Sequence, residues 1–349
     1  MTLVYLSIFI IVLYNIKILS FNDYNENPLS MSNGNAIKGL AAILIVLHHI
    51  SQRIENPGKL LFFRYIGYLQ VAIFLFFSGY GLMKSYKSKK GYLEGFWKKR
   101  IPKIVIPFIL ANILFLAVYR LVLHTKFSMY EIITCTLGLR LIDGFKWYVI
   151  AIIVLYVGFY LTFKYLKENL SIFGIFLVVT SYNYICFKLG QGEWWYNATY
   201  CFLIGIIFAN YEKYLINIIR KYYLIVTTIL LTSFIYTFIS NIHKSNIYMA
   251  MISSILFVLV CPCILMKCEL NSRILKFLGG ISYEIYLVHR MFLDILMGMS
   301  NKYLYLLICI SMSILLAYLF SIFSKKIVNT YIFLINSNRI KTYDTEINN

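Results

Sequence analysis

The chain consists mainly of apolar runs of about 17 to 22 residues separated by short polar gaps. A helix of about 20 residues crosses the ~30 Å hydrocarbon core of a bilayer, so each run predicts a membrane-spanning helix. The runs lie at 3–20, 37–52, 62–83, 103–123, 147–166, 170–189, 196–211, 222–240, 247–266, 275–297 and 303–323. The sequence therefore predicts an all-α, polytopic bundle of about 11 transmembrane helices.

Composition supports this interpretation, because 60% of the residues are hydrophobic and only 13% are charged, against about 25% charged in ordinary soluble domains. A net charge of +19 would suggest a nucleic-acid partner in a soluble protein, but here the cations lie in the gaps between apolar runs. Membrane orientation and anionic lipids account for that pattern. We therefore expect a lipid bilayer and no nucleic acid as partner.

The gap from Lys84 to Lys103 holds eight cations and should face the cytoplasm. Alternating the eleven spans from this gap places 22 of the 33 Lys and Arg residues on the cytoplasmic side, with the N-terminus outside and the C-terminus in the cytoplasm. The run 3–20 has neither a cationic start nor a small-residue cleavage site. It predicts a retained helix rather than a signal peptide.

The cysteines predict neither a disulfide nor a metal site. They lie within or beside apolar runs and lack metal-ligand spacing, apart from a single Cys-Pro-Cys. We interpret them as small apolar residues. The seven are Cys135, Cys186, Cys201, Cys261, Cys263, Cys268 and Cys309.

The segment KGLAAILIVLHH, from Lys38 to His49, places ionisable groups inside an apolar helix. Eleven residues at about 100° each bring His49 to within roughly 20° of Lys38, about 16 Å further along the axis. The two side chains therefore share one face of the helix. Such groups are costly in a membrane and by default mark a functional site. The alternative is that His48 or His49 only hydrogen-bonds to a neighbouring helix.

Two further segments carry polar residues next to apolar runs. In FLFFSGYGLM (74–83), Ser78 and Gly79 are typical of close helix packing, with contact to substrate as the alternative. In FWKKRIPKIVIP (96–107), the cations continue into the start of a span, where topogenic charge alone explains them less well. Arg100 and Lys103 are therefore candidates for binding an anion.

The segment FLGGISYEIYLVH (277–289) places three polar residues on one helical stripe, because Ser282, Tyr286 and His289 fall at i, i+4 and i+7. Glu284 lies about 140° from His289 and cannot pair with it on the same helix. It must find a partner elsewhere, such as a cation. A structural polar network is at least as good an explanation for Tyr283 and Tyr286, whereas His289 and Glu284 are rarer and weigh more as functional residues.

These segments resemble the acyltransferase-3 family, integral membrane enzymes that transfer acyl groups from a cytoplasmic thioester to surface glycans. The resemblance runs from residue 36 to roughly 325. Lys38 departs from the Arg that is usual in the family, and the span 3–20 is additional to the usual ten. The resemblance implies that the chain has three parts: an N-terminal helix and linker (1–36), an acyltransferase-3-like membrane domain (37–325) and a cytoplasmic tail (326–349).

The resemblance also implies roles for individual residues. His49, His289 and Glu284 become candidate catalytic residues. Acyl-coenzyme A becomes the co-substrate, with its phosphates on a cationic cluster. Trp147, at the start of KWYVIAIIVLY, and Tyr286 become candidate contacts to the acceptor. The cationic cluster comprises Lys38, Lys99, Arg100 and Lys103.

The implied reaction is transfer of an acyl group, acetyl by resemblance, to a hydroxyl of an exported polysaccharide in a bacterial inner (plasma) membrane. A histidine suits this reaction because it titrates near neutral pH. His49 would act as general base, with Tyr286 or His289 stabilising the oxyanion. A transient acyl-imidazole remains an alternative to direct transfer.

Two other classes of function compete with this interpretation. A transporter or glycan flippase would use the intramembrane charges as a pathway, but its signature of repeats and paired broken spans is not evident in the sequence. A membrane scaffold or lipid-binding protein fits the charge and leaves the face shared by Lys38 and His49 unexplained.

Overall fold

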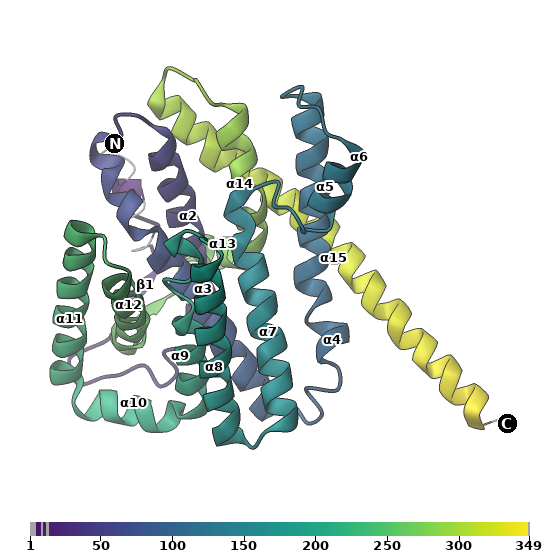
Figure 1. Cartoon of the computed structure of the whole chain (residues 1–349). Coiled ribbons are helices and arrows are strands. Elements are labelled where there is room, and N and C mark those ends of the chain that lie inside the picture. Colours follow the sequence, from purple (N-terminus) through teal and green to yellow (C-terminus); the bar gives the residue numbers. More distant parts are fainter. Residues whose placement is uncertain (1–4, 8–9, 12–13, 348–349) are drawn as a thin grey trace.

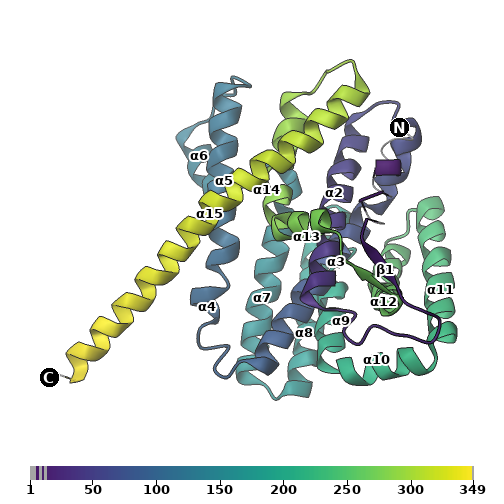
Figure 2. The ribbon, with the colours of Figure 1, turned by 180° about the vertical axis from the view of Figure 1, so that it is seen from behind.

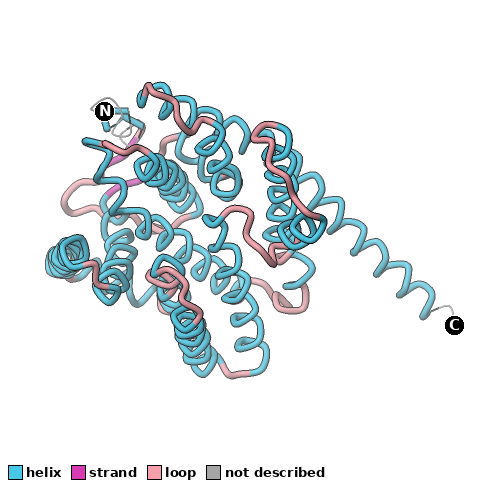
Figure 3. Tube along the Cα trace, turned by 45° about the horizontal axis from the view of Figure 1, so that its top comes forward, coloured by secondary structure: helices cyan, strands magenta, loops and turns pink. Residues whose placement is uncertain are grey.

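The computed structural model describes residues 5–7, 10–11 and 14–347, with side chains described as far as residue 335. The fold is a bundle of helices with short connections (Figure 1, Figure 3). The long helices are α2 (Met31–Arg53), α3 (Leu61–Ser88), α5 (Pro102–Leu121), α7 (Trp147–Tyr165), α8 (Glu168–Lys188), α11 (Tyr223–Lys244), α12 (Ile247–Lys267) and α15 (Lys302–Ile347). The shorter helices are α4 (Phe96–Lys99), α6 (Met129–Thr136), α9 (Tyr200–Asn210), α10 (Glu212–Lys221), α13 (Arg273–Gly280) and α14 (Ser282–Ile295). Three single-turn 3₁₀ helices are η1 (Gly58–Leu60), η2 (Gly144–Lys146) and η3 (Glu193–Trp195), and two strands are β1 (Ile16–Ile18) and β2 (Cys268–Leu270).

The prediction of an all-α membrane protein is confirmed. Within the described residues, eight helices are long and apolar enough to cross a membrane, or up to nine if α9 and α10, which meet at 87°, form one bent span. The predicted number of 11 spans is not confirmed. One difference is the span 275–297, which is broken into α13 and α14 at Ile281. The chain is a multi-pass membrane protein.

The second difference is at the N-terminus. Part of the predicted span 3–20 lies outside the described residues, at positions 1–4, 8–9 and 12–13. A helix cannot continue to residue 20, because Asn15 has a φ of 61° and Ile16 to Ile18 form β1. Asparagine tolerates this left-handed conformation better than most residues. Strand β1 pairs antiparallel with β2, with Ile16 opposite Leu270.

Glycines bring α2 and α13 into direct backbone contact. A Cβ atom at Gly39 would lie 2.0 Å from the carbonyl oxygen of Leu275, and one at Gly279 would lie 1.9 Å from that of Asn35. Only residues without a side chain allow helices to approach this closely. This contact sets the position of α2, the helix that carries Lys38 and His49.

A second reciprocal glycine contact joins α3 and α9. A Cβ at Gly79 would lie 2.1 Å from the carbonyl oxygen of Phe202, and one at Gly205 would lie 2.1 Å from that of Phe76. The interpretation of Gly79 as a packing residue is therefore confirmed. Together the two contacts fix α2 and α3, which pack against each other, within the bundle.

Several charged residues gather at one end of the bundle. At the end that contains α4 and α10, shown at the bottom of Figure 1, Lys84 pairs with Glu212 at 2.6 Å and Lys87 with Glu168 at 3.3 Å. We call this end the basic face. The connection between α14 and α15 lies at the opposite end. The topology of the chain and the direction of the bundle in the membrane stay predictions.

Helix α15 crosses the back of the bundle diagonally, next to α5 and α14, and its C-terminal part extends away from the other helices (Figure 2). The predicted span 303–323 is thus the first half of a helix that continues to Ile347. Much of the predicted tail 326–349 is helical, and residues 348–349 lie outside the described residues.

Candidate active site

A cavity of about 440 Å³ lies in the connection between α3 and α5, on the basic face. We call it the basic cavity. Six cationic side chains and a single carboxylate, that of Glu94, line it. The cations are Lys89, Lys90, Lys98, Lys99, Arg100 and Lys103. The cavity is therefore suited to a ligand with several negative charges.

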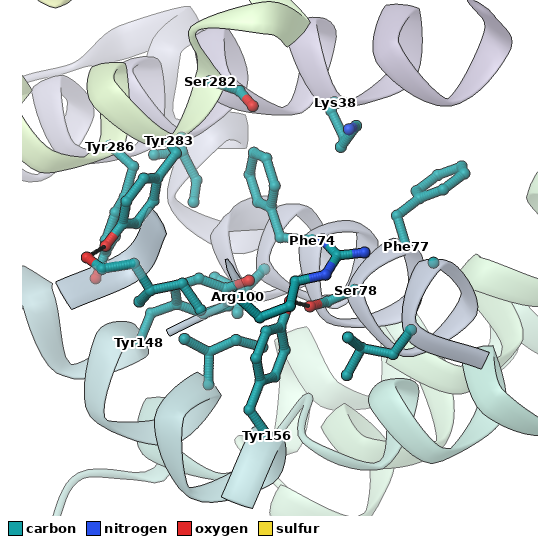
Figure 4. Close-up of a pocket in the computed structure, with 16 residues that line it drawn as sticks. Lys38, Phe74, Phe77, Ser78, Arg100, Tyr148, Tyr156, Ser282, Tyr283 and Tyr286 are labelled. Atoms are coloured by element: carbon teal, nitrogen blue, oxygen red, sulfur yellow. Dashed lines mark hydrogen bonds between the residues drawn. The ribbon is translucent and has the colours of Figure 1, made fainter. Parts of the chain in front are cut away.

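A second cavity, of about 290 Å³, adjoins the basic cavity, because Arg100 lines both. We call it the middle cavity. Lys38 and Arg100 reach into it from opposite walls (Figure 4). The guanidinium of Arg100 donates to the hydroxyls of Tyr92 (2.9 Å) and Ser85 (3.2 Å). These bonds orient Arg100 at the boundary between the two cavities.

A third cavity, of about 490 Å³, contains His48 and His49 and is called the histidine cavity. It shares four lining residues with the middle cavity, namely Ile45, Val71, Tyr148 and Tyr286. The three cavities therefore follow one another from the basic face to the histidines. Lys38, Ile45 and His49 all face this path, so the shared face predicted for α2 is observed.

The His49 ring is held by one hydrogen bond and one stacking contact. Its Nδ1 lies 3.0 Å from Oε1 of Gln52. A carbonyl oxygen only accepts, so Nδ1 carries the proton and Nε2 keeps its lone pair in the neutral ring. The ring also stacks on Phe145, with centroids 3.7 Å apart and planes 14° apart. His49 thus has a fixed orientation and a basic nitrogen available in the cavity.

His289 lies beside His49, as the two predicted roles require. The ring centroids are 5.2 Å apart and the planes are 21° apart. Nδ1 of His289 is 3.1 Å from the carbonyl oxygen of Ile285 and 2.9 Å from that of Tyr286, so it carries the proton. Nε2 is buried and has no hydrogen-bond partner among the described residues. His289 thus lies beside the His49 ring but is not among the residues that line the three cavities.

The turn that precedes α7 supports the histidines from the other side. The Phe145 amide donates to Asp143 Oδ1 at 2.8 Å, and the Tyr286 hydroxyl donates to the Phe145 carbonyl. Arg290 Nη1 donates to the same Asp143 oxygen at 3.0 Å, and its guanidinium lies 4.7 Å from the Phe145 ring centre. Asp143 is fully buried. This network fixes the ring on which His49 stacks.

His48 has a structural role. Its Nδ1 donates to the carbonyl oxygen of Phe63 at 2.9 Å, across from α2 to α3. A Cβ at Gly67 would come within 2.5 Å of the His48 ring. The alternative of a histidine that only hydrogen-bonds to a neighbouring helix thus applies to His48, although its ring also lines the histidine cavity.

The other predicted site residues fall into three groups. Lys99 and Lys103 line the basic cavity with Arg100. Trp147 and Tyr286 line the histidine cavity, but the Tyr286 hydroxyl already donates to Phe145. The remaining residue, Glu284, is buried and is not among the residues that line the three cavities.

Sequence reasoning missed several residues of the site. Gln52 lies three residues after His49, about one helical turn further along the same face. It could therefore have been predicted by extending the face of Lys38 and His49 by one turn. Arg290 is a charged residue inside the predicted span 275–297. An ionisable residue within an apolar span was the reason for selecting His49, and the same reason applies to Arg290. Asp143 and Phe145 precede a predicted span and carry no signal, because only the folded turn brings them to the histidines.

The model of one protein family, described as an acyltransferase domain and here called the acyltransferase-3 family, matches residues 34–322. That range includes all three cavities and every predicted site residue. No curated protein and no solved structure matches the chain. Because the matched range is more than half of its length, the chain belongs to the acyltransferase-3 family.

Proposed function

We propose that this membrane acyltransferase transfers an acyl group, acetyl in the simplest case, from acyl-coenzyme A at the basic face to a hydroxyl of an exported or cell-surface polysaccharide. The observation that carries the proposal is the series of three cavities that joins six cations to an oriented histidine. A flippase would not need a histidine whose tautomer is held by Gln52 at the far end of a series of cavities that begins with cations.

The basic cavity suits the phosphates of coenzyme A. Six cations against one carboxylate attract a polyanion, and Arg100 provides the planar fork that binds phosphate oxygens in pairs. The middle cavity then takes the flexible arm of the donor. Lys38 lines the middle cavity, where its ammonium group would bind the end of the coenzyme A phosphates that reaches this cavity. This arrangement directs the thioester toward the histidine cavity.

In the proposed reaction, Nε2 of His49 accepts the proton of an acceptor hydroxyl. The hydroxyl oxygen forms a bond to the acyl carbon, the carbon–sulfur bond breaks, and the proton passes from His49 to the leaving thiolate. Tyr286 and His289 were expected to stabilise the oxyanion, but their protons are already donated to backbone carbonyls. Tyr148 lines both the middle cavity and the histidine cavity, and no hydrogen bond of its hydroxyl occurs among the described residues. We assign the oxyanion contact to Tyr148.

The test uses the full-length chain in lipid nanodiscs, with radiolabelled acetyl-coenzyme A and glycan released from the surface of cells that lack the gene. His49→Ala should lower transfer at least about 100-fold, because general base catalysis contributes that much. His243→Ala, an exposed histidine on α11 outside the three cavities, is the matched control and should leave transfer unchanged.

Mass spectrometry of surface glycans gives the second readout. Cells with the wild-type protein should carry one additional acyl mass that is missing in cells with His49→Ala. Transfer above a tenth of the wild-type rate in the correctly inserted His49 variant would remove this residue from its role. Uptake of a solute into vesicles without loss of thioester would favour a transporter.

A further inference from the structure

The histidine cavity has an aromatic wall that the proposed donor path does not use. Trp194, in η3, lines this cavity and is 58% exposed. Trp147 lines the same cavity but is only 7% exposed, and its ring packs against Trp195. An exposed indole at a cavity wall offers a flat apolar face to a ligand, whereas a buried one does not.

The position of the Trp194 ring depends on a glycine. The ring lies against Gly192, where a Cβ would come within 2.3 to 2.5 Å of three ring carbons. A side chain at position 192 would therefore push the indole away. The glycine at position 192 thus leaves room for the indole in this position.

Asn197 adds an unused hydrogen-bond acceptor to the same cavity. Its side chain lines the cavity, and its Oδ1 is buried without a hydrogen-bond partner among the described residues. A buried acceptor without a partner is costly, so a ligand that donates a hydroxyl proton to it gains binding energy. Trp194 and Asn197 come from one short segment between α8 and α9.

The charged groups around this cavity are already engaged. Arg64 donates to the carbonyl oxygens of Ser51 and Ile54, both at 2.8 Å. Arg290 pairs with Asp143 and Asp294, both at 3.0 Å. The basic cavity, in contrast, has six cations for one carboxylate. Because protein oxygens already bind both guanidinium groups of the histidine cavity, this cavity attracts an anion less strongly than the basic cavity does.

We propose that Trp194 and Asn197 form the acceptor subsite and bind one pyranose ring of an uncharged glycan. The apolar face of the sugar stacks on the indole, and one hydroxyl donates to Asn197 Oδ1. A neighbouring hydroxyl then points toward Nε2 of His49. This inference rests on the proposed function, since it names the class of acceptor that the same site takes.

The first experiment separates the acceptor from the donor. The full chain in nanodiscs is assayed for acetyl transfer to released surface glycan, and for hydrolysis of acetyl-coenzyme A without glycan. Trp194→Leu should raise the glycan concentration for half-maximal transfer about tenfold, the scale of one aromatic contact, and Gly192→Ala should act in the same direction. Trp194→Phe should retain most of the affinity. Hydrolysis should stay within twofold in all three variants.

A control variant tests whether Trp194 only anchors the protein at the membrane interface. Trp97 is also exposed, at 40%, but lies in α4 at the basic face. Trp97→Leu should leave the half-saturating glycan concentration unchanged. An equal effect of Trp97→Leu and Trp194→Leu would overturn the inference, and so would unchanged half-saturation in Trp194→Leu.

Direct binding distinguishes failure of the subsite from failure of the proposed function. Fluorescein-labelled hexasaccharides of glucose and of N-acetylglucosamine are titrated with the protein, and anisotropy is measured. At least one should bind the wild type, with loss of binding in Trp194→Leu and Asn197→Leu. Such binding without acetyl transfer would support the subsite and contradict the proposed function. Binding of neither sugar would overturn the subsite.

Discussion

Gln52 accepts the Nδ1 proton of His49 across one helical turn, at 3.0 Å, and so determines which nitrogen of the ring is basic. The Phe145 ring fixes the plane of the same imidazole. The two contacts come from different elements, α2 and the turn before α7. The catalytic competence proposed for His49 therefore depends on two residues that act through its imidazole ring and have no role of their own in the proposed proton transfer.

Replacing Gln52 tests this dependence. Gln52→Leu should lower kcat about tenfold, since it removes one hydrogen bond worth about 1.4 kcal/mol and releases the tautomer. Gln52→Glu restores an acceptor oxygen and should recover most of the rate. Its carboxylate favours the imidazolium, so the acid limb of the rate profile should move to higher pH. Identical profiles for the wild type and Gln52→Glu would contradict the role of Gln52.

Lys38 should act on donor affinity rather than on chemistry. Lys38→Met should raise the KM for acetyl-coenzyme A about 10- to 100-fold, the value of a charge-assisted hydrogen bond, with little change in kcat. Lys38→Arg should preserve the KM, because the charge remains. The control is Lys213→Met, an exposed cation of α10 that lines none of the three cavities. A fall in kcat at unchanged KM in Lys38→Met would move Lys38 out of the donor site.

The pair Arg290 and Asp143 should matter for stability. Arg290→Met leaves the fully buried Asp143 carboxylate without its partner, which should cost about 3 to 5 kcal/mol of unfolding free energy. Asp143→Asn in the same background removes the unpaired charge and should recover at least half of the loss. Denaturation of the detergent-solubilised protein measures both values. Additive losses in the double variant would show that the two residues are not coupled.

Two adjacent glycines of α13 provide a matched test of helix packing. Gly279→Ala should destabilise the protein by about 1 to 3 kcal/mol, because its Cβ would collide with the Asn35 carbonyl oxygen. Gly280→Ala meets no atom within 4 Å and should be neutral or slightly stabilising. Thermal unfolding of the two variants compares them directly. Equal unfolding temperatures would show that α2 and α13 separate without cost.

The sequence by itself determined that the chain forms a helical membrane bundle and where most helices lie. The length and apolar character of each run decide this, since lipid offers no other partner for backbone groups. It also determined that Lys38 and His49 share a face, because helical geometry is local. Local sequence patterns predicted the helices less well in two segments, one at the N-terminus and one in the C-terminal part of the chain. The run 3–20 does not continue as a helix past Asn15, and the run 275–297 is broken at Ile281.

Only the tertiary structure decided which polar residues meet. His289 and Phe145 reach His49 from α14 and from the turn before α7, over separations that no periodicity encodes. Glu284 was as unusual in an apolar run as His289, yet it lines none of the three cavities, whereas His289 lies beside His49. The physical reason is that helical spacing defines the direction of a side chain, whereas close contacts between helices, such as that of Gly39 with α13, define what it faces.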